Sequence, residues 1–234
     1  MLKTIDIKQV LYDMGADLCG VASIDRFEEA PEGFHPHDLL PTCKSVIVFA
    51  KEMHAGTLHS GTTTPYTITR NMLIHELDVI SVRFCGVMAK SGIIAVPTGT
   101  ISPGRFDHKT GRWRGAISAK HSAAAAGLGW IGKNTLLVTP EYGNMVWLSA
   151  VLLDTELEPD PMQSESLCKD DCMLCTDNCP ANALGNPEMN QSACRSFVFR
   201  EVEGDDLTFK CYRCRTICPY CYGSKNTFIK PGAV

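Results

Sequence analysis

The sequence lacks three features that would indicate particular classes of protein. It has no run of Lys or Arg, and its 22 basic and 26 acidic residues give a net charge of −4 at pH 7. Because proteins that bind nucleic acid through phosphates usually carry a basic patch, we expect no nucleic-acid partner. The opening segment MLKTIDIKQV lacks the apolar core of a signal peptide, and no stretch of about 18 apolar residues could span a bilayer. We therefore expect a cytoplasmic protein with no membrane partner.

Low-complexity segments are also missing, and 44% hydrophobic and 21% charged residues are ordinary values for a globular chain. The twelve cysteines are the exception. In a reduced compartment such a count indicates metal binding rather than disulfides. Cys19, Cys43 and Cys85 are scattered in apolar segments and are expected to be inert core thiols, whereas nine cysteines fall between 168 and 221. A metal-binding module concentrates its cysteines in this way.

The part of the chain before these cysteines predicts helices alternating with strands. Apolar residues at helical spacing predict helices over 4–14 and about 70–90, and small residues predict a third over 116–126. Apolar runs predict strands over 18–24, 46–50 and 93–96, with 46–50 buried on both faces. Two further strands, 135–139 and 145–153, are predicted to form a hairpin.

Two segments are predicted to lie between regular elements. Residues 97–115, rich in Gly, Pro, Arg and His, form a long loop, and acidic, proline-rich residues 154–163 form a linker. We therefore expect an α/β cofactor or substrate domain over 1–160, a cysteine module over 161–224 and a frayed tail over 225–234.

The clustered cysteines form two related motifs. The first is Cys168-x3-Cys172-x2-Cys175-x3-Cys179-Pro, and the second is Cys211-x2-Cys214-x3-Cys218-Pro, preceded by Cys194. In two-cluster ferredoxins the last cysteine of such a run, followed by Pro, ligates the other cluster. The motifs therefore predict two [4Fe–4S] clusters, with zinc as the less favoured alternative.

The exchange of the last cysteines assigns ligands to each cluster. The first cluster is predicted to take Cys168, Cys172, Cys175 and Cys218. The second takes Cys211, Cys214 and Cys179, and its fourth ligand is predicted to be Cys194, with Cys221 as the rival. A fourth ligand is needed because seven cysteines cannot complete two clusters of four ligands.

A glycine-rich segment, Gly127-Leu-Gly-Trp-Ile-Gly-Lys-Asn134, resembles two nucleotide-binding motifs. Both motifs need a strand before the loop and a helix after it, and here the predicted order is reversed. We instead predict a tight turn that exposes its backbone to a flat or anionic ligand, although a helix C-cap at Gly127 would account for one glycine. The predicted cofactor-binding residues are Gly127, Gly129, Trp130, Gly132, Lys133 and Asn134.

These motifs together resemble a known superfamily over residues 10–221. The segments AAAAGLGWIGKNTLLVTPEYG and LSAVLLDTELEPD, with the paired cysteine motifs, look like the epoxyqueuosine reductases, whose core is shared by corrinoid-dependent reductive dehalogenases. The resemblance implies an α+β architecture: an α/β domain of nitroreductase-like or cobalamin-binding type, followed by a two-cluster ferredoxin-like domain. In those enzymes the clusters reduce a cobalamin that lies between the two parts.

The chain departs from that family at two places. Family members carry an Asp proton donor in a V-D-[ST]-x-P stretch, whereas residues 96–100 read V-P-T-G-T. They also continue into helical repeats, so we expect a short member whose activity is not epoxyqueuosine reduction. Asp107, His108 and His121 are the candidate replacements for the proton donor.

Two functions are consistent with these observations. The favoured one is an iron–sulfur oxidoreductase that receives electrons from a ferredoxin-type or flavodoxin-type donor and passes them to a small-molecule or corrinoid substrate near residues 127–134. The alternative is an electron-transfer partner without an organic cofactor, whose N-terminal domain docks another protein.

Overall fold

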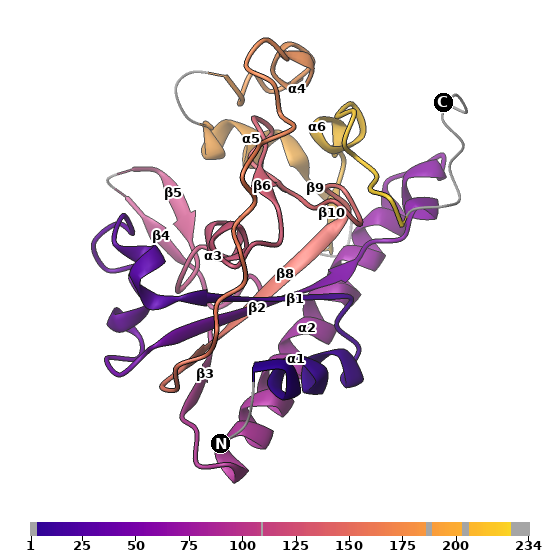
Figure 1. Ribbon diagram of the computed structural model, residues 1–234. Coiled ribbons are helices and arrows are strands. Elements are labelled where there is room, and N and C mark those ends of the chain that lie inside the picture. The colour runs from indigo at the N-terminus through magenta and orange to yellow at the C-terminus, as the bar shows by residue number, and fades with distance from the viewer. Residues whose placement is uncertain (1–3, 109, 186–188, 203–205, 226–234) are drawn as a thin grey trace.

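A computed structural model describes residues 4–108, 110–185, 189–202 and 206–225 (Figure 1). A central sheet lies between two layers of helices, and the cysteine-bearing segments gather at the end of the molecule drawn uppermost. Within the described residues, none of the helices combines the length and the apolar character needed to cross a bilayer.

The central sheet has four strands in the order β1-β2-β8-β3, and every neighbouring pair is antiparallel. The strands are β1 (Leu18–Ser23), β2 (Ser45–Glu52), β8 (Val146–Leu153) and β3 (Ala95–Pro97). Strand β2 is central, and its alternate residues enter two different hydrophobic cores: Val46 and Val48 on one face, Ile47 and Phe49 on the other. The prediction that this strand is buried on both faces is confirmed.

Helices α1 (Thr4–Asp13) and α2 (Thr64–Lys90) cover one face of the sheet. Leu77, Phe84 and Met88 of α2 are fully buried there. The helix begins six residues before the predicted start because Pro65 occupies its first turn, where the missing proline N–H costs nothing and φ is already helical. Both predicted helices are therefore present.

Helix α3 (Ala119–Ala125) covers the opposite face and packs closely on β1. A Cβ atom added to Gly20 would lie 2.3 Å from the carbonyl oxygen of Ala126. The small side chains of α3 and Gly20 thus let helix and strand backbones approach. The remaining short helical turns of this part are η1 (Ile24–Phe27), η2 (Pro36–Asp38) and η3 (Ala55–His59).

The predicted hairpin over 135–153 is wrong. Strand β7 (Leu137–Val138) pairs with β6 (Trp130–Ile131), and β8 instead joins β2 and β3 in the central sheet. Eight residues of β8 pair with β2, so the backbone N–H and C=O groups of this long strand find partners in the central sheet, where both of its faces are also buried. The two-residue strand β7 could pair with only a small part of β8.

The predicted loop over 97–115 also contains regular structure. Strands β4 (Arg105–Asp107) and β5 (Arg112–Arg114) form a hairpin in which Phe106 lies opposite Trp113. Gly111, at φ +66°, supplies the left-handed conformation that the turn needs. Contact between these two aromatic rings stabilises the pair of strands. The composition of the segment alone did not indicate these strands.

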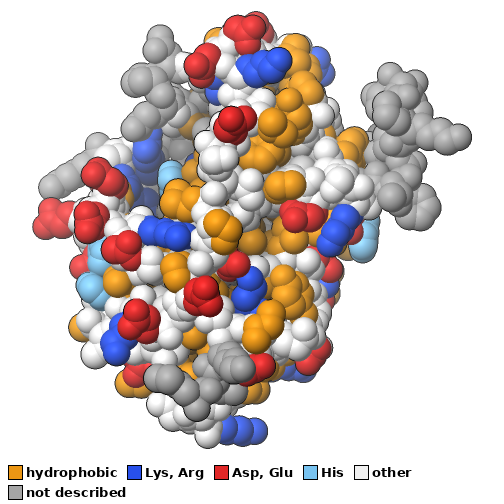
Figure 2. All heavy atoms as spheres, in the orientation of Figure 1, with side chains coloured by type: hydrophobic (Ala, Val, Ile, Leu, Met, Phe, Trp, Pro, Cys, Tyr) orange, Lys and Arg blue, Asp and Glu red, His pale blue; other side chains and the backbone are white. Residues whose placement is uncertain are grey.

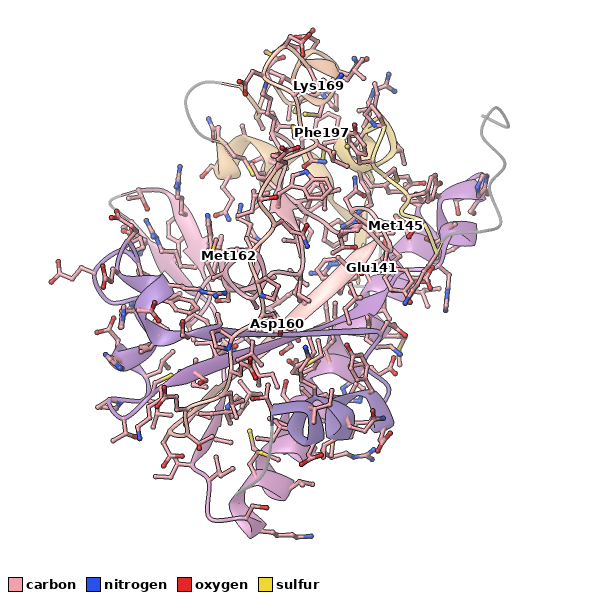
Figure 3. All side chains as sticks on the ribbon, in the orientation of Figure 1. Glu141, Met145, Asp160, Met162, Lys169 and Phe197 are labelled. Carbon is pink, nitrogen blue, oxygen red and sulfur yellow. The ribbon has the colours of Figure 1, made fainter. Side chains whose placement is uncertain are left out.

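The cysteine-bearing segments contain α4 (Leu174–Asp177), α5 (Gln191–Val198), β9 (Phe199–Val202), β10 (Asp206–Phe209) and α6 (Arg213–Thr216), with β9 and β10 antiparallel. They pack on the start of α2, where Tyr66 stacks on Tyr212 with ring centroids 4.5 Å apart. The preceding linker is held to the sheet by Asp160, which accepts hydrogen bonds from Lys8 at 2.9 Å and the Val21 N–H at 2.8 Å (Figure 3).

The close contact of α3 with β1 predicts opposite effects of two glycine substitutions. Gly20→Ala should lower the free energy of unfolding by about 1–3 kcal/mol, because a methyl group there overlaps a backbone carbonyl. Gly86→Ala, in α2 with nothing within 4 Å of the added Cβ, should raise it by about 0.5–1 kcal/mol. Urea unfolding followed by circular dichroism measures both values. A neutral Gly20→Ala would contradict the close approach.

Candidate functional site

A short hairpin brings the glycine-rich segment to the cysteines. Its turn is closed by hydrogen bonds from the Thr135 N–H to the Gly132 carbonyl at 2.8 Å and from the Gly132 N–H to the Leu136 carbonyl at 3.0 Å. Buried Asn134 sits within this turn, and its Oδ1 accepts the Leu136 N–H at 3.1 Å. The hairpin between β6 and β7 therefore presents residues 132–135 to the cysteine-bearing segments.

A first cavity lies beside this turn and is bordered by four cysteines. It encloses about 720 Å³ including its opening to solvent. The turn residues Trp130, Gly132, Lys133 and Asn134 form part of its wall, together with Leu167, Leu174, Pro219 and Tyr220. The four cysteines are Cys168, Cys172, Cys175 and Cys218.

A second cavity of about 430 Å³, again counted to its opening, lies on the other side of Asn134. Four further cysteines border it: Cys179, Cys194, Cys211 and Cys214. Apolar residues such as Leu184, Val198 and Phe197, which Figure 3 labels, complete the wall. The two groups of four are those into which the motif spacing divides the cysteines.

The eight thiols surround cavities rather than a point. All twelve cysteines are free of disulfides. Within the described residues, no three or more Cys, His, Asp or Glu side chains converge closely enough to hold a single metal ion. Burial raises the pKa of Cys214 to about 11, Arg215 opposes this effect, and Cys194, Cys211 and Cys179 add to it. The thiols are thus near enough to repel one another when ionised.

Backbone and side-chain donors of the hairpin point at the cysteine loops. The Lys133 N–H donates to Cys168 Sγ at 3.4 Å, and Lys133 Nζ donates to the carbonyls of Asp170 and Cys172. Asn134 Nδ2 donates to the Cys214 carbonyl at 3.1 Å. Asn134 borders both cavities, so one residue separates them.

One buried donor beside the first cavity has no partner among the described residues. Trp130 is 9% exposed, and its Nε1 makes no hydrogen bond. An unsatisfied buried donor costs about 1–3 kcal/mol. The Lys133 N–H and the four thiols suit a sulfur-rich group in the first cavity.

The remaining cysteines do not border either cavity. Cys221, the rival ligand, is 2% exposed and packs in an apolar cluster with Met53, Leu73 and Met145, the last labelled in Figure 3. Burial raises its pKa to about 12. Cys19 and Cys43 are buried in the main cores and Cys85 is partly buried, as expected for core thiols.

The glycines of the turn meet the chain's own backbone. Gly127 has φ +76° and ends α3, as the C-cap interpretation predicts. An added Cβ would lie 2.2 Å from the Pro161 carbonyl oxygen at Gly127, and 2.0 Å from that of Val138 at Gly129. Internal packing therefore requires these two glycines. The cofactor-binding role of the segment stays a prediction.

The three candidate proton donors lie outside the two cavities. Asp107 pairs with Arg114 at 3.5 Å and accepts a hydrogen bond from Thr110, on the hairpin of β4 and β5. His108 is exposed and packs edge-on against Phe106. His121, in α3, lies 2.6 Å from Ser118 through Nδ1, and partial burial beside Lys120 lowers its pKa. Their role as donors stays a prediction.

Asn144 is a structural residue of the site that no sequence pattern marks. It is 1% exposed, its Nδ2 donates to the Arg215 carbonyl at 3.1 Å, and its N–H bonds the carbonyls of Tyr220 and Cys221. It follows Gly143, whose positive φ turns the chain against residues 220–221. The structural role of Asn144 is evident only from these contacts with residues that are distant in the sequence.

Known proteins resemble this chain in sequence and in fold. No protein-family model matches the chain. The epoxyqueuosine reductase of Listeria monocytogenes is 38% identical over 117 residues, which cover 45% of this chain and 30% of that protein. The structure of epoxyqueuosine reductase from Streptococcus thermophilus has a TM-score of 0.67 at 22% identity and covers 98% of this chain and 68% of that one.

A reductive dehalogenase structure, described with a mechanism for B12-dependent dehalogenation, has a TM-score of 0.64 at 17% identity, covering 92% of this chain and 31% of that one. The resemblance to epoxyqueuosine reductases is thus confirmed in sequence, and the chain shares its mixed α/β fold with the reductase and dehalogenase structures. The sequence relatives are named as reductases, so the chain is related to oxidoreductase enzymes. It spans about 30% of the length of the curated relatives it matches.

One structural neighbour conflicts with an expectation. An epoxyqueuosine reductase was solved with a modified tRNA stem loop; it has a TM-score of 0.63 at 24% identity and covers 92% of this chain and 64% of that one. The net charge of −4 led us to expect no nucleic-acid partner. This neighbour shows that a protein of the same fold can be bound to a tRNA stem loop, so the fold does not support that expectation.

Asn134 borders both cavities, and we expect its substitution to lower the stability of the protein. Asn134→Leu should lower the free energy of unfolding by about 1–3 kcal/mol, because the Cys214 carbonyl and the Leu136 N–H both lose their partner. Asn71→Leu, at an exposed site of α2, should change it by less than about 0.5 kcal/mol. Denaturant unfolding of protein purified without oxygen compares the two; equal effects would mean that the Asn134 contacts contribute nothing.

Proposed function

We propose that the chain is an iron–sulfur oxidoreductase that holds two [4Fe–4S] clusters. Cys168, Cys172, Cys175 and Cys218 hold the first, and Cys179, Cys194, Cys211 and Cys214 hold the second. The observation that carries the proposal is the pair of cavities, each bordered by three cysteines of one stretch and one from the other. In domain terms, a nitroreductase-like α/β part over 1–160 precedes a ferredoxin-like part over 161–224.

The shape of the site favours clusters over zinc. A structural zinc ion holds its four ligands about 2.0–2.3 Å from one point. The thiols here border cavities of about 720 and 430 Å³ and, within the described residues, do not converge on a point. A cubane of iron and sulfide holds its four thiolates apart on different iron atoms, which agrees with thiols that border a cavity.

The clusters supply one-electron transfer, and the chain's residues shape the environment in which it occurs. The Lys133 N–H bonds Cys168 Sγ at 3.4 Å, and the Ala183 N–H bonds Cys179 Sγ at 3.3 Å. Hydrogen bonds to ligand sulfur stabilise added negative charge and so raise the reduction potential. Asn134 forms part of both walls, which leaves a short path for an electron between the cavities.

The electron acceptor is proposed to be a small molecule or a corrinoid near residues 127–134, with a ferredoxin-type or flavodoxin-type donor. Support comes from the turn, whose residues 130–134 border the first cavity. Gly127 and Gly129 are covered by backbone, so they do not form a corrinoid cradle, and the corrinoid rests on the dehalogenase neighbour alone. Epoxyqueuosine is not the proposed substrate, because Pro97 stands where the family carries its acid.

The alternative, an electron-transfer partner, is supported by the surface around the first cavity. Leu167, Met173 and Leu174 are 45%, 41% and 44% exposed. Figure 2 shows hydrophobic side chains gathered at this end of the molecule. Exposed apolar side chains beside a redox site suit contact with another protein.

The ligand assignment predicts different iron contents for two cysteine variants. Cys194→Ala should lower iron from about eight to about four atoms per chain, because the second cluster loses a ligand. Cys221→Ala should leave the iron content unchanged, since Cys221 borders neither cavity. Iron and sulfide are counted after anaerobic purification, with zinc measured alongside. The reverse pattern, or zinc in place of iron, would overturn the assignment.

The acceptor is tested by spectroscopy. If a corrinoid binds, anaerobic incubation with cobalamin should change its visible spectrum toward the base-off form, and the corrinoid should remain bound through gel filtration. A small-molecule acceptor or a pure electron carrier predicts an unchanged spectrum and no retained corrinoid. The iron content of the same sample is measured as a control, because it shows whether the clusters were present during the incubation with cobalamin.

A further inference from the structure

Arg215 is a buried cation that has no carboxylate partner among the residues that the structure describes. It lies in α6 and is 4% exposed. Within the described residues, no carboxylate lies at ion-pair distance from it, and Nη1 makes one long hydrogen bond, 3.5 Å, to Asn144 Oδ1. Arginine is almost never fully buried unless paired, because desolvating an unpaired charge costs several kcal/mol.

The surroundings hold Arg215 in place. Its N–H donates to the Tyr212 carbonyl at 3.0 Å, and its own carbonyl accepts Asn144 Nδ2 at 3.1 Å. Asn144 is itself buried and bonded to residues 220 and 221. Arg215 directly follows Cys214 in α6, and Cys214 borders the second cavity. The buried positive charge is therefore held in the same helical turn as a proposed ligand of the second cluster.

We propose that Arg215 is the internal counter-ion of the cluster in the second cavity and raises the reduction potential of that cluster. This inference rests on the proposed function. A [4Fe–4S] cluster with four thiolates carries a net charge of about −2, and about −3 after it accepts one electron from an external one-electron donor. No bond is made or broken in that step, so a fixed nearby cation stabilises the reduced state more than the oxidised state.

A purely structural role for Arg215 makes a different prediction. If Arg215 contributed only through its packing or its hydrogen bond to Asn144, removal of its charge would leave the reduction potential of the second cluster unchanged. Arg213 provides a matched control, because it lies in the same helix, is exposed, and donates to Asn178 Oδ1 at 3.3 Å. Solvent screens its charge, so it should contribute little.

The experiment measures cluster potentials in four anaerobically purified proteins: wild type, Arg215→Gln, Arg215→Lys and Arg213→Gln. Iron is counted first, and each protein is then titrated with dithionite and mediators under electron paramagnetic resonance. In Arg215→Gln, the equilibrium constant for reduction of one of the two clusters should fall at least tenfold, equal to about 59 mV for a one-electron couple. Arg215→Lys and Arg213→Gln should stay close to wild type.

The outcomes separate the counter-ion from other roles. Loss of about half the iron in Arg215→Gln, restored in Arg215→Lys, also supports the counter-ion, because charge alone rescues the cluster. Unchanged potentials in Arg215→Gln, or an equal defect in Arg215→Lys, would overturn it. A wild type without iron refutes the proposed function instead, whereas two intact clusters with no shift refute only the role of Arg215.

Discussion

The placement of the hairpin turn at residues 132–135 is the constraint on which the site depends. Buried Asn134 lies between two cavities, and its side chain bonds both its own turn and the Cys214 carbonyl. Lys133 ties the same turn to the loop that carries Cys168 and Cys172. The cysteine-bearing segments are thus assembled around a part of the α/β fold and not merely appended to it.

The sheet and α3 determine where that hairpin emerges. Close contact of Gly20 with Ala126 sets the distance of α3 from β1, and Gly127 ends the helix against Pro161. Because Gly129 has no side chain, the backbone just before β6 can lie against the Val138 carbonyl. A side chain at any of these glycines would push backbone apart and displace the turn. Gly127 and Gly129 therefore support the site through packing.

Local spacing accounts for what could be predicted from the sequence. Both long helices and the buried strand β2 depend on neighbours a few residues apart, so residue patterns reveal them. The division of the cysteines into two groups joins runs that are far apart along the chain, and it was predicted from the ferredoxin-like order of the motifs. The pairing of β7 with β6 was missed because a two-residue strand has no periodicity. The contacts between Asn144 and Arg215 were missed because these residues are 71 positions apart along the chain.

The crossing of Cys179 and Cys218 has a consequence for assembly. Each of these residues belongs to one cysteine run but borders the cavity of the other. Neither run encloses a complete set of four thiols by itself, so a fragment that ends between them would have no finished site. Each proposed cluster would therefore take ligands from both runs. A chain that holds only one of the two clusters is then already cross-linked between the run that begins at Cys168 and the run that ends at Cys218.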